Sequence, residues 1–172
     1  PADLEQRGKR DVLAAVGAAR AHVELGLLAE WDRQDRDEAK KQYEAARALA
    51  PALSAALVRV RRLATQKPER GEALPILQEE LGLADNDDLR ADLHTLRART
   101  FEALNQTQQA RTAFIEALKF QKQHAGALRG LEAVLRRELA QGKKDRANEL
   151  AEHLAKLADV YGSGTAPNDV DA

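Results

Sequence analysis

Apolar residues recur along this chain at the three- and four-residue spacing of amphipathic helices, not at the alternating spacing of strands. Four helical runs, each followed by a short turn and a second helix, cover roughly 18–32, 52–66, 89–103 and 125–140. The turns that follow these runs contain Gln34–Asp35, Pro68, Asn105 and Gly142. Asn and Gly tolerate the left-handed backbone conformation that a tight helix end requires. The pattern predicts helix, turn and helix, repeated four times.

An alanine leads the second helix of each predicted unit, and these alanines are almost evenly spaced. They are Ala39, Ala73, Ala110 and Ala147, with spacings of 34, 37 and 37 residues. A period of about 20–50 residues indicates stacked helical units that bury a continuous core only together. The small residue allows a neighbouring helix to approach closely, and a larger residue one turn later fills the remaining space.

The best copies of this second helix are Ala39-x3-Tyr43-x2-Ala46-x4-Pro51 and Ala110-x3-Phe114-x2-Ala117. They resemble the tetratricopeptide repeat, whose second helix carries A-x3-F and a late proline. Leu25-Gly26 is similar to the leucine–glycine pair of that family's first helix, although one residue out of phase. Arg61 and Arg97 depart from the family pattern, because they fall at positions that are usually apolar or small.

The resemblance covers four repeats, near 20–53, 54–90, 91–127 and 128–161. It implies an all-α fold, a right-handed α-α superhelix of about four tetratricopeptide-like helix-turn-helix repeats. We therefore expect three regions. Residues 1–17 form an N-terminal helix that caps the first repeat or continues into it, 18–161 form the repeat domain, and 162–172 form a disordered tail or linker. Glycine costs about 1 kcal/mol relative to alanine inside a helix, which favours a break near Gly17.

Composition agrees with an all-α chain and excludes several classes of function. Aromatic residues make up only 3% of the sequence, and strong helix formers such as Ala, Leu, Glu and Arg dominate it. The net charge of −1 gives no overall attraction to nucleic acid or to an anionic membrane. The absence of cysteine excludes disulfides and thiolate metal sites.

Localisation stays open between cytoplasm, periplasm and an envelope complex. We see no signal peptide, and no unbroken apolar run approaches the roughly 20 residues that membrane insertion requires. The chain starts at Pro1 without Met, which suggests an excised or processed fragment. Its Ala-, Leu- and Arg-rich composition is typical of bacterial proteins with GC-rich coding sequences.

No catalytic or metal-binding pattern is present, so we expect neither an enzyme nor a cofactor. The four histidines, at positions 22, 94, 124 and 153, form no close ligand pair, and no glycine-rich phosphate loop occurs. The acidic stretch 85–88 lacks the Gly and Glu of a calcium loop and is typical of a helix cap. Trp31, the only tryptophan, is expected to pack against the turn that follows it, and stacking on a ligand is the alternative.

Three arginines recur with the repeat and suggest a binding surface. They are Arg62, Arg99 and Arg136, spaced 37 residues apart. In the family that the chain resembles, their positions on the first helices face a concave groove. The resemblance places Leu28 at the corresponding position of the first repeat, and adds Val58, Thr95 and Arg129 to the same face. Guanidinium groups pair well with carboxylates, so these arginines suggest an acidic ligand. The competing interpretation is that they only neutralise nearby Glu and Asp side chains on a solvated surface.

The sequence therefore predicts a non-catalytic protein–protein interaction module, or scaffold. Its partner is a protein or peptide segment, acidic or C-terminal, held in the concave groove beside an apolar pocket at Leu28 and Val58. The paired Asn and Lys/Arg of chaperone-binding tetratricopeptide domains are absent from the groove positions, so we exclude that mode of binding. The alternative is a structural element of a larger complex that self-associates into a homo-oligomer.

Overall fold

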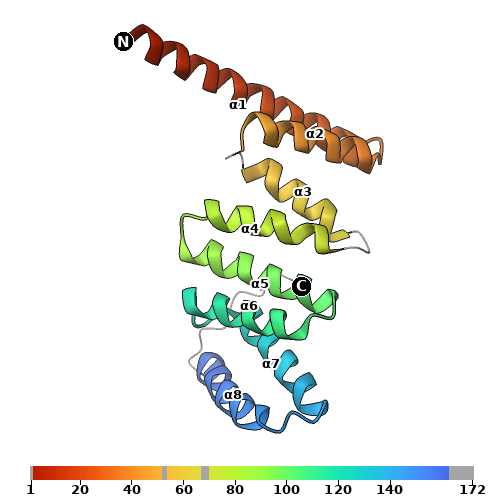
Figure 1. The fold of residues 1–172 in the computed structure, drawn as a ribbon, viewed down its shortest axis with the longest axis vertical. Helices are drawn as coiled ribbons and strands as arrows, with labels where there is room; N and C mark the ends of the chain where they lie inside the picture. Colours follow the sequence, from red (N-terminus) through yellow and green to blue (C-terminus); the bar gives the residue numbers. More distant parts are fainter. Residues whose placement is uncertain (1, 52–53, 67–69, 163–172) are drawn as a thin grey trace. The chain divides into compact units, whose positions relative to one another are not determined.

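The computed structural model describes residues 2–51, 54–66 and 70–162 of the chain. These residues form eight α-helices and one 3-10 turn, and no strand occurs among them, which confirms the all-α prediction (Figure 1). The elements are α1 (Ala2–Trp31), α2 (Arg36–Leu49), α3 (Ser54–Gln66), η1 (Arg70–Glu72), α4 (Ala73–Leu83), α5 (Asp87–Ala103), α6 (Thr107–Phe120), α7 (Ala125–Ala140) and α8 (Arg146–Gly162).

The helices follow the predicted order of first and second helices, separated by short turns. Three of the four predicted turn residues, Gln34, Asn105 and Gly142, have positive φ angles of 53°, 58° and 89°. This is the left-handed conformation that ends a helix and allows the next one to fold back. The fourth, Pro68, lies outside the described residues.

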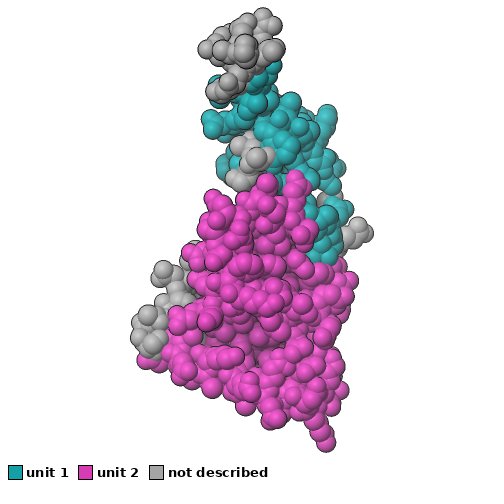
Figure 2. All heavy atoms as spheres, turned by 60° about the vertical axis from the view of Figure 1, so that its left-hand side comes forward, with its two compact units in different colours: residues 1–76 teal, residues 77–172 magenta. Residues whose placement is uncertain are grey.

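The chain divides into two compact units, Pro1–Ile76 (unit 1) and Leu77–Ala172 (unit 2), coloured separately in Figure 2. The division falls inside α4, whose first turn belongs to unit 1. The sequence-derived boundaries at 17/18 and 161/162 stay a prediction, and most of the expected tail lies outside the described residues.

Unit 1 is built on the hairpin of α1 and α2. Asp35 begins α2 as its N-cap, because its carboxylate accepts a hydrogen bond of 3.0 Å from the Glu38 amide. The helix buries Ala39, Tyr43 and Ala46 on one face. Gly26 on α1 packs directly on the Tyr43 ring, and a Cβ at this glycine would overlap the ring. The predicted close approach of small residues is therefore present in this hairpin.

Helix α1 is a single 30-residue helix rather than two shorter ones. It continues through Gly17 without the favoured break, since nothing near Gly17 forces a change of direction. Its segment Asp11–Trp31, with a mean hydropathy of 1.5, is long and apolar enough by composition to cross a membrane. The sequence contains no unbroken apolar run here, because Arg20, His22 and Glu24 interrupt it, but the Ala, Val and Leu residues around them raise the average. The same segment contributes Ala19 and Val23 to the core of unit 1.

Unit 2 contains the hairpin of α5 and α6, against which α7 packs. Its main core cluster includes Ala98, Ala110, Ala113, Phe114, Ala117, Ala127, Leu131, Val134, Leu135 and Leu150. Gly130 on α7 packs on the ring of Phe114, as Gly26 packs on Tyr43 in unit 1. The alanine–aromatic pattern of the second helix therefore sets the close packing in both units.

A fully buried carboxylate organises the turn between α7 and α8. Glu138 is 0% exposed, and it accepts hydrogen bonds from Lys143 at 2.6 Å and from Arg146 at 3.1 Å. Arg111 lies 3.9 Å away and also pairs with Glu149 on α8. A buried charge is stable only when it is paired and hydrogen-bonded. This network therefore fixes how α8 follows α7.

Candidate partner-binding site

In unit 1, the predicted groove residues lie on α1 and α3 with exposed side chains. Leu28 and Val58 are exposed large apolar residues, and Arg62 lies one turn after Val58 on α3. Arg62 Nη2 donates a hydrogen bond of 2.9 Å to Glu30 Oε1. Part of the Arg62 charge is therefore neutralised inside the unit, as the competing interpretation anticipates.

A cavity of about 420 Å³ opens beside this ion pair. It is lined by Glu30, Trp31, Gln34, Arg36 and Arg62. These residues come from the end of α1, the following turn, the start of α2 and the middle of α3. Arg62 and Trp31 each stand out in the sequence, but no local pattern brings them together, because Arg62 on α3 is 26 or more residues away from the other lining residues.

The wall of this cavity continues into the core through Tyr43. The Tyr43 hydroxyl donates a hydrogen bond of 3.0 Å to Glu30 Oε2, so both oxygens of the Glu30 carboxylate are occupied. Burial, and then the hydrogen bond to Glu30, raise the pKa of Tyr43 to about 12. The phenol therefore stays neutral at physiological pH and holds the carboxylate in one orientation.

Trp31 does not pack into the turn, contrary to the expectation from the sequence. Its side chain is 63% exposed, and the guanidinium carbon of Arg59 lies 5.5 Å from the ring centroid. The reason is geometric: α1 presents Trp31 on the side away from the buried stripe of Ala19, Val23 and Gly26. The only tryptophan of the chain is thus a wall of the cavity.

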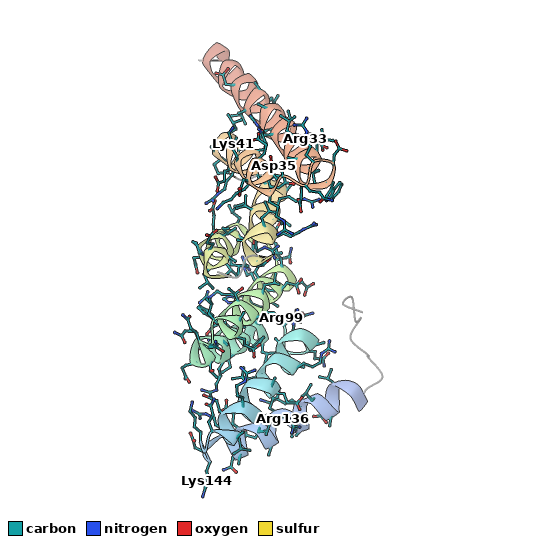
Figure 3. All side chains as sticks on the ribbon, turned by 90° about the vertical axis from the view of Figure 1, so that its right-hand side faces the viewer. Arg33, Asp35, Lys41, Arg99, Arg136 and Lys144 are labelled. Atoms are coloured by element: carbon teal, nitrogen blue, oxygen red, sulfur yellow. The ribbon has the colours of Figure 1, made fainter. Side chains whose placement is uncertain are left out.

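In unit 2, three of the four predicted groove residues are exposed. Arg99 lies on α5, and Arg129 and Arg136 lie on α7; Figure 3 labels Arg99 and Arg136. Thr95 differs, because it is only 4% exposed and its hydroxyl donates to the Ala91 carbonyl oxygen at 2.9 Å. Thr95 therefore offers almost no surface to a partner.

Acidic side chains accompany these arginines. Arg136 donates a hydrogen bond of 2.7 Å to Glu132 one turn earlier, and Arg137 lies 3.6 Å from Glu102. Burial raises the pKa of Glu102, against the opposing charges of Arg137 and Arg99. The surface carries both signs of charge rather than a column of arginine alone.

His124 is a residue of this face to which the sequence analysis gave no role. Its Nδ1 accepts a hydrogen bond of 3.1 Å from the Ala127 amide and so caps α7, while Nε2–H donates to Asp92 on α5 at 2.8 Å. A capping histidine has no strong sequence signature, since Ser, Thr, Asp and Asn are the usual caps. His94, by contrast, stacks on Phe120, and burial, followed by the charge of Arg97, lowers the pKa of His94.

A second cavity, of about 730 Å³, lies in unit 2 and was also missed. Its apolar walls include Leu118 on α6, Leu128 and Leu131 on α7, and Val160 on α8. Lys119, Lys156 and Glu152 are among its charged lining residues. Leucines at helical spacing predict a buried helix face. The cavity along this face arises from the packing of α6, α7 and α8, which the spacing of residues does not predict.

The acidic stretch at 85–88 acts as a cap. The Asn86 side chain accepts a hydrogen bond of 2.8 Å from the Leu89 amide at the start of α5. Among the residues that the structure describes, no group of three or more His, Asp or Glu side chains is placed to hold a metal ion. The helix cap inferred from the sequence is confirmed.

The paired helices, the left-handed turns and the buried alanines define a helical-repeat protein with a tetratricopeptide-like fold. Solved structures of MamA, a tetratricopeptide-like protein, are similar to this chain. "MamA 41-end from Desulfovibrio magneticus RS-1" has a TM-score of 0.64 at 19% identity, over 86% of this chain and 78% of that chain.

Two MamA variants are similar as well. The "MamA RS-1 ArsTM double mutant" has a TM-score of 0.65 at 19% identity, over 85% of this chain and 76% of that chain. The "MamA D159K mutant 1" has a TM-score of 0.58 at 15% identity, over 93% of this chain and 99% of that chain. No protein-family model and no curated protein matches the chain. The likeness therefore establishes the fold.

Proposed function

We propose that this chain is a non-catalytic interaction module that holds an acidic segment of a partner protein against the first helices of its repeats. The observation that carries the proposal is the exposure of six of the seven predicted groove residues. They are Leu28, Val58, Arg62, Arg99, Arg129 and Arg136. Three of the four second helices bury their leading alanine completely, at Ala39, Ala73 and Ala110, whereas Ala147 on α8 is exposed.

The arginines support an acidic partner even where they already have an acidic neighbour. Each guanidinium has five N–H donors in a planar fork. Arg62 uses Nη2 toward Glu30, and Arg136 uses Nε toward Glu132, so donors remain for an incoming carboxylate. The acidic neighbours orient each guanidinium, which reduces the entropy that binding must overcome.

Self-association is the second candidate, and one observation favours it. Helix α1 exposes Val12, Leu13, Leu25 and Leu28, with Val12 at 62% and Leu13 at 70%. The apolar end of a repeat array needs a cover, which a second copy of the chain would supply. A molar mass that rises with concentration would support this candidate, and a strict monomer at high concentration would exclude it.

The experiment that tests the interaction module compares two charge-matched variants in a capture assay from a lysate of the source organism. The first is Arg99→Glu with Arg136→Glu on the first helices. The control is Lys41→Glu with Lys144→Glu, on a second helix and a turn (Figure 3). Circular dichroism confirms that both are folded.

We expect a partner that the wild-type chain and the control retain and that the arginine variant loses. A partner held equally by all three proteins would place binding elsewhere and overturn the proposed role of these arginines.

A further inference from the structure

The cavity at the α1–α2 turn of unit 1 combines features that suit one kind of ligand. We infer that it binds the carboxylate of an aspartate or glutamate in a partner peptide, between Arg36 and Arg62 and beside Trp31. This inference rests on the proposed function and deepens it, because it names where and how unit 1 holds an acidic side chain.

Glu30 positions the site and does not compete for the ligand. Its side chain is 8% exposed, and its two oxygens accept hydrogen bonds from Arg62 and Tyr43. Because Tyr43 is completely buried, the carboxylate is fixed to the core of the unit. Arg62 is therefore held by one Nη atom, while its side chain stays 46% exposed.

Arg36 supplies a second guanidinium from another helix. It is the first residue of α2, follows the N-cap Asp35 and lines the same cavity as Arg62. Asp35 itself is occupied by the Glu38 amide. Within the described part of the chain, no ion pair holds Arg36. The N-terminal turn of a 14-residue helix adds a partial positive charge at this point.

Carboxylate is the chemistry that these groups recognise. A cation would meet the like charges of Arg36 and Arg62. Two planar guanidinium forks and the Gln34 amide instead offer N–H donors matched to a planar anion. A volume of about 420 Å³ lies within the range of small ligand sites, about 300–1,000 Å³.

The surroundings favour a peptide over a free acid. Leu28 lies one helical turn before Trp31, and Val58 lies one turn before Arg62; both are exposed. An apolar residue next to the acidic one in the ligand would bury these side chains. Such burial contributes about 25 cal/mol per Å² of apolar surface.

Trp31 provides the test, because it is the only tryptophan in the chain and lines the cavity. Trp31 fluorescence is titrated with the probe peptide acetyl-Leu-Glu-Asp-Leu-amide and with its neutral counterpart acetyl-Leu-Gln-Asn-Leu-amide. We expect a saturable change with the acidic peptide only, weakened as salt is raised. An equal response to both peptides, or no response to either, overturns the inference.

Three variants locate the ligand. Arg36→Gln is expected to weaken binding of the acidic peptide roughly tenfold, because one charge-assisted hydrogen-bonding group is lost. Arg62→Gln should also weaken binding, but it removes a hydrogen-bond partner of buried Glu30 and could disturb the fold. Arg36→Gln is therefore the decisive variant. Arg33→Gln, in the same turn but outside the cavity lining, removes the same charge and should bind like wild type. Wild-type affinity in Arg36→Gln, or an equal loss in Arg33→Gln, contradicts the inference.

The two proposals fail in different ways. If Trp31 does not respond while the arginine variant of unit 2 still loses its partner, the cavity inference is wrong and the interaction module stands. If the probe peptide binds through Arg36 but the variant of Arg99 and Arg136 still captures the partner, the cavity inference stands and the proposed role of Arg99 and Arg136 is wrong.

Discussion

Gly26 packs on the Tyr43 ring in unit 1, and Gly130 packs on the Phe114 ring in unit 2. Both rings are 0% exposed, and both glycines allow a backbone to approach an aromatic face. The difference is one hydroxyl group. In unit 1 it donates to Glu30 and connects the core to Arg62 at the edge of a cavity, whereas Phe114 lies in an apolar cluster. A shared packing position can thus also support a polar site at the surface.

The buried acids of the two units also differ in how they relate to the surface. Glu138 in unit 2 is fully enclosed and is paired with Lys143 in the following turn, with Arg146 at the start of α8 and with Arg111 on α6. Glu30 in unit 1 lines an open cavity and is paired with Arg62 from another helix pair. The first network holds three helices together, α6, α7 and α8, whereas the second leaves the Arg62 guanidinium exposed at a cavity.

The largest effect is expected from Phe114→Tyr, which copies the unit 1 residue into unit 2. The new hydroxyl would enter a cluster of Ala, Leu and Val side chains, with no acid in the place of Glu30. Burying an unpaired hydroxyl and adding an atom to a packed core should lower the free energy of unfolding by about 3 kcal/mol. Urea unfolding followed by circular dichroism measures this. A variant as stable as wild type would show that the cluster accommodates a polar group.

Gly130→Ala tests the close approach itself. The new Cβ would overlap the Phe114 ring, so we expect a loss of about 2 kcal/mol from overpacking, even after the gain in helix propensity. Gly17→Ala on α1 is the matched control, because nothing lies within 4 Å of the position its Cβ would occupy. It should raise the free energy of unfolding by up to about 1 kcal/mol. Equal effects of the two substitutions would contradict the packing argument.

The smallest effect is expected from Tyr43→Phe, which makes unit 1 resemble unit 2. Loss of the hydrogen bond to Glu30 should cost about 1.5 kcal/mol near neutral pH. The pKa of Tyr43 is raised to about 12 in the folded chain, from 10.0. Its stabilising contribution is therefore complete below pH 10 and is lost as pH rises through 12. Urea unfolding at pH 8 and pH 11.5 measures the stability difference between wild type and variant. We expect this difference to be smaller at pH 11.5. An unchanged difference would argue against the link between Tyr43 ionisation and stability.

Local signals in the sequence were sufficient to predict much of the fold. Helical periodicity located the helix pairs, and residue type located the turns at Gln34, Asn105 and Gly142, because both depend on short segments of chain. The break near Gly17 was wrong, since a propensity cost of about 1 kcal/mol does not end a helix whose neighbours on both sides are strongly helical.

The candidate site was predicted only in part, because its shape depends on tertiary packing. Exposure of the arginines follows from helical register, which the repeat spacing predicted. Thr95 was placed on the surface, yet it points toward the start of α7, where its methyl group lies near Gly126. The packing of Gly130 on Phe114 and the cavity shared by Trp31 and Arg62 needed distant segments to be brought together, which no local pattern encodes.

Helix α4 places a limit on how this protein can be dissected. Its 11 residues are divided between the two compact units, with Ala73–Ile76 in one and Leu77–Leu83 in the other. Isolated helices shorter than about 12–15 residues are marginal in water. A cut at the unit boundary would leave two fragments of this helix, each too short to persist alone. Expression of either half should therefore include the whole helix, and a protease that cleaves within it would destabilise both halves at once.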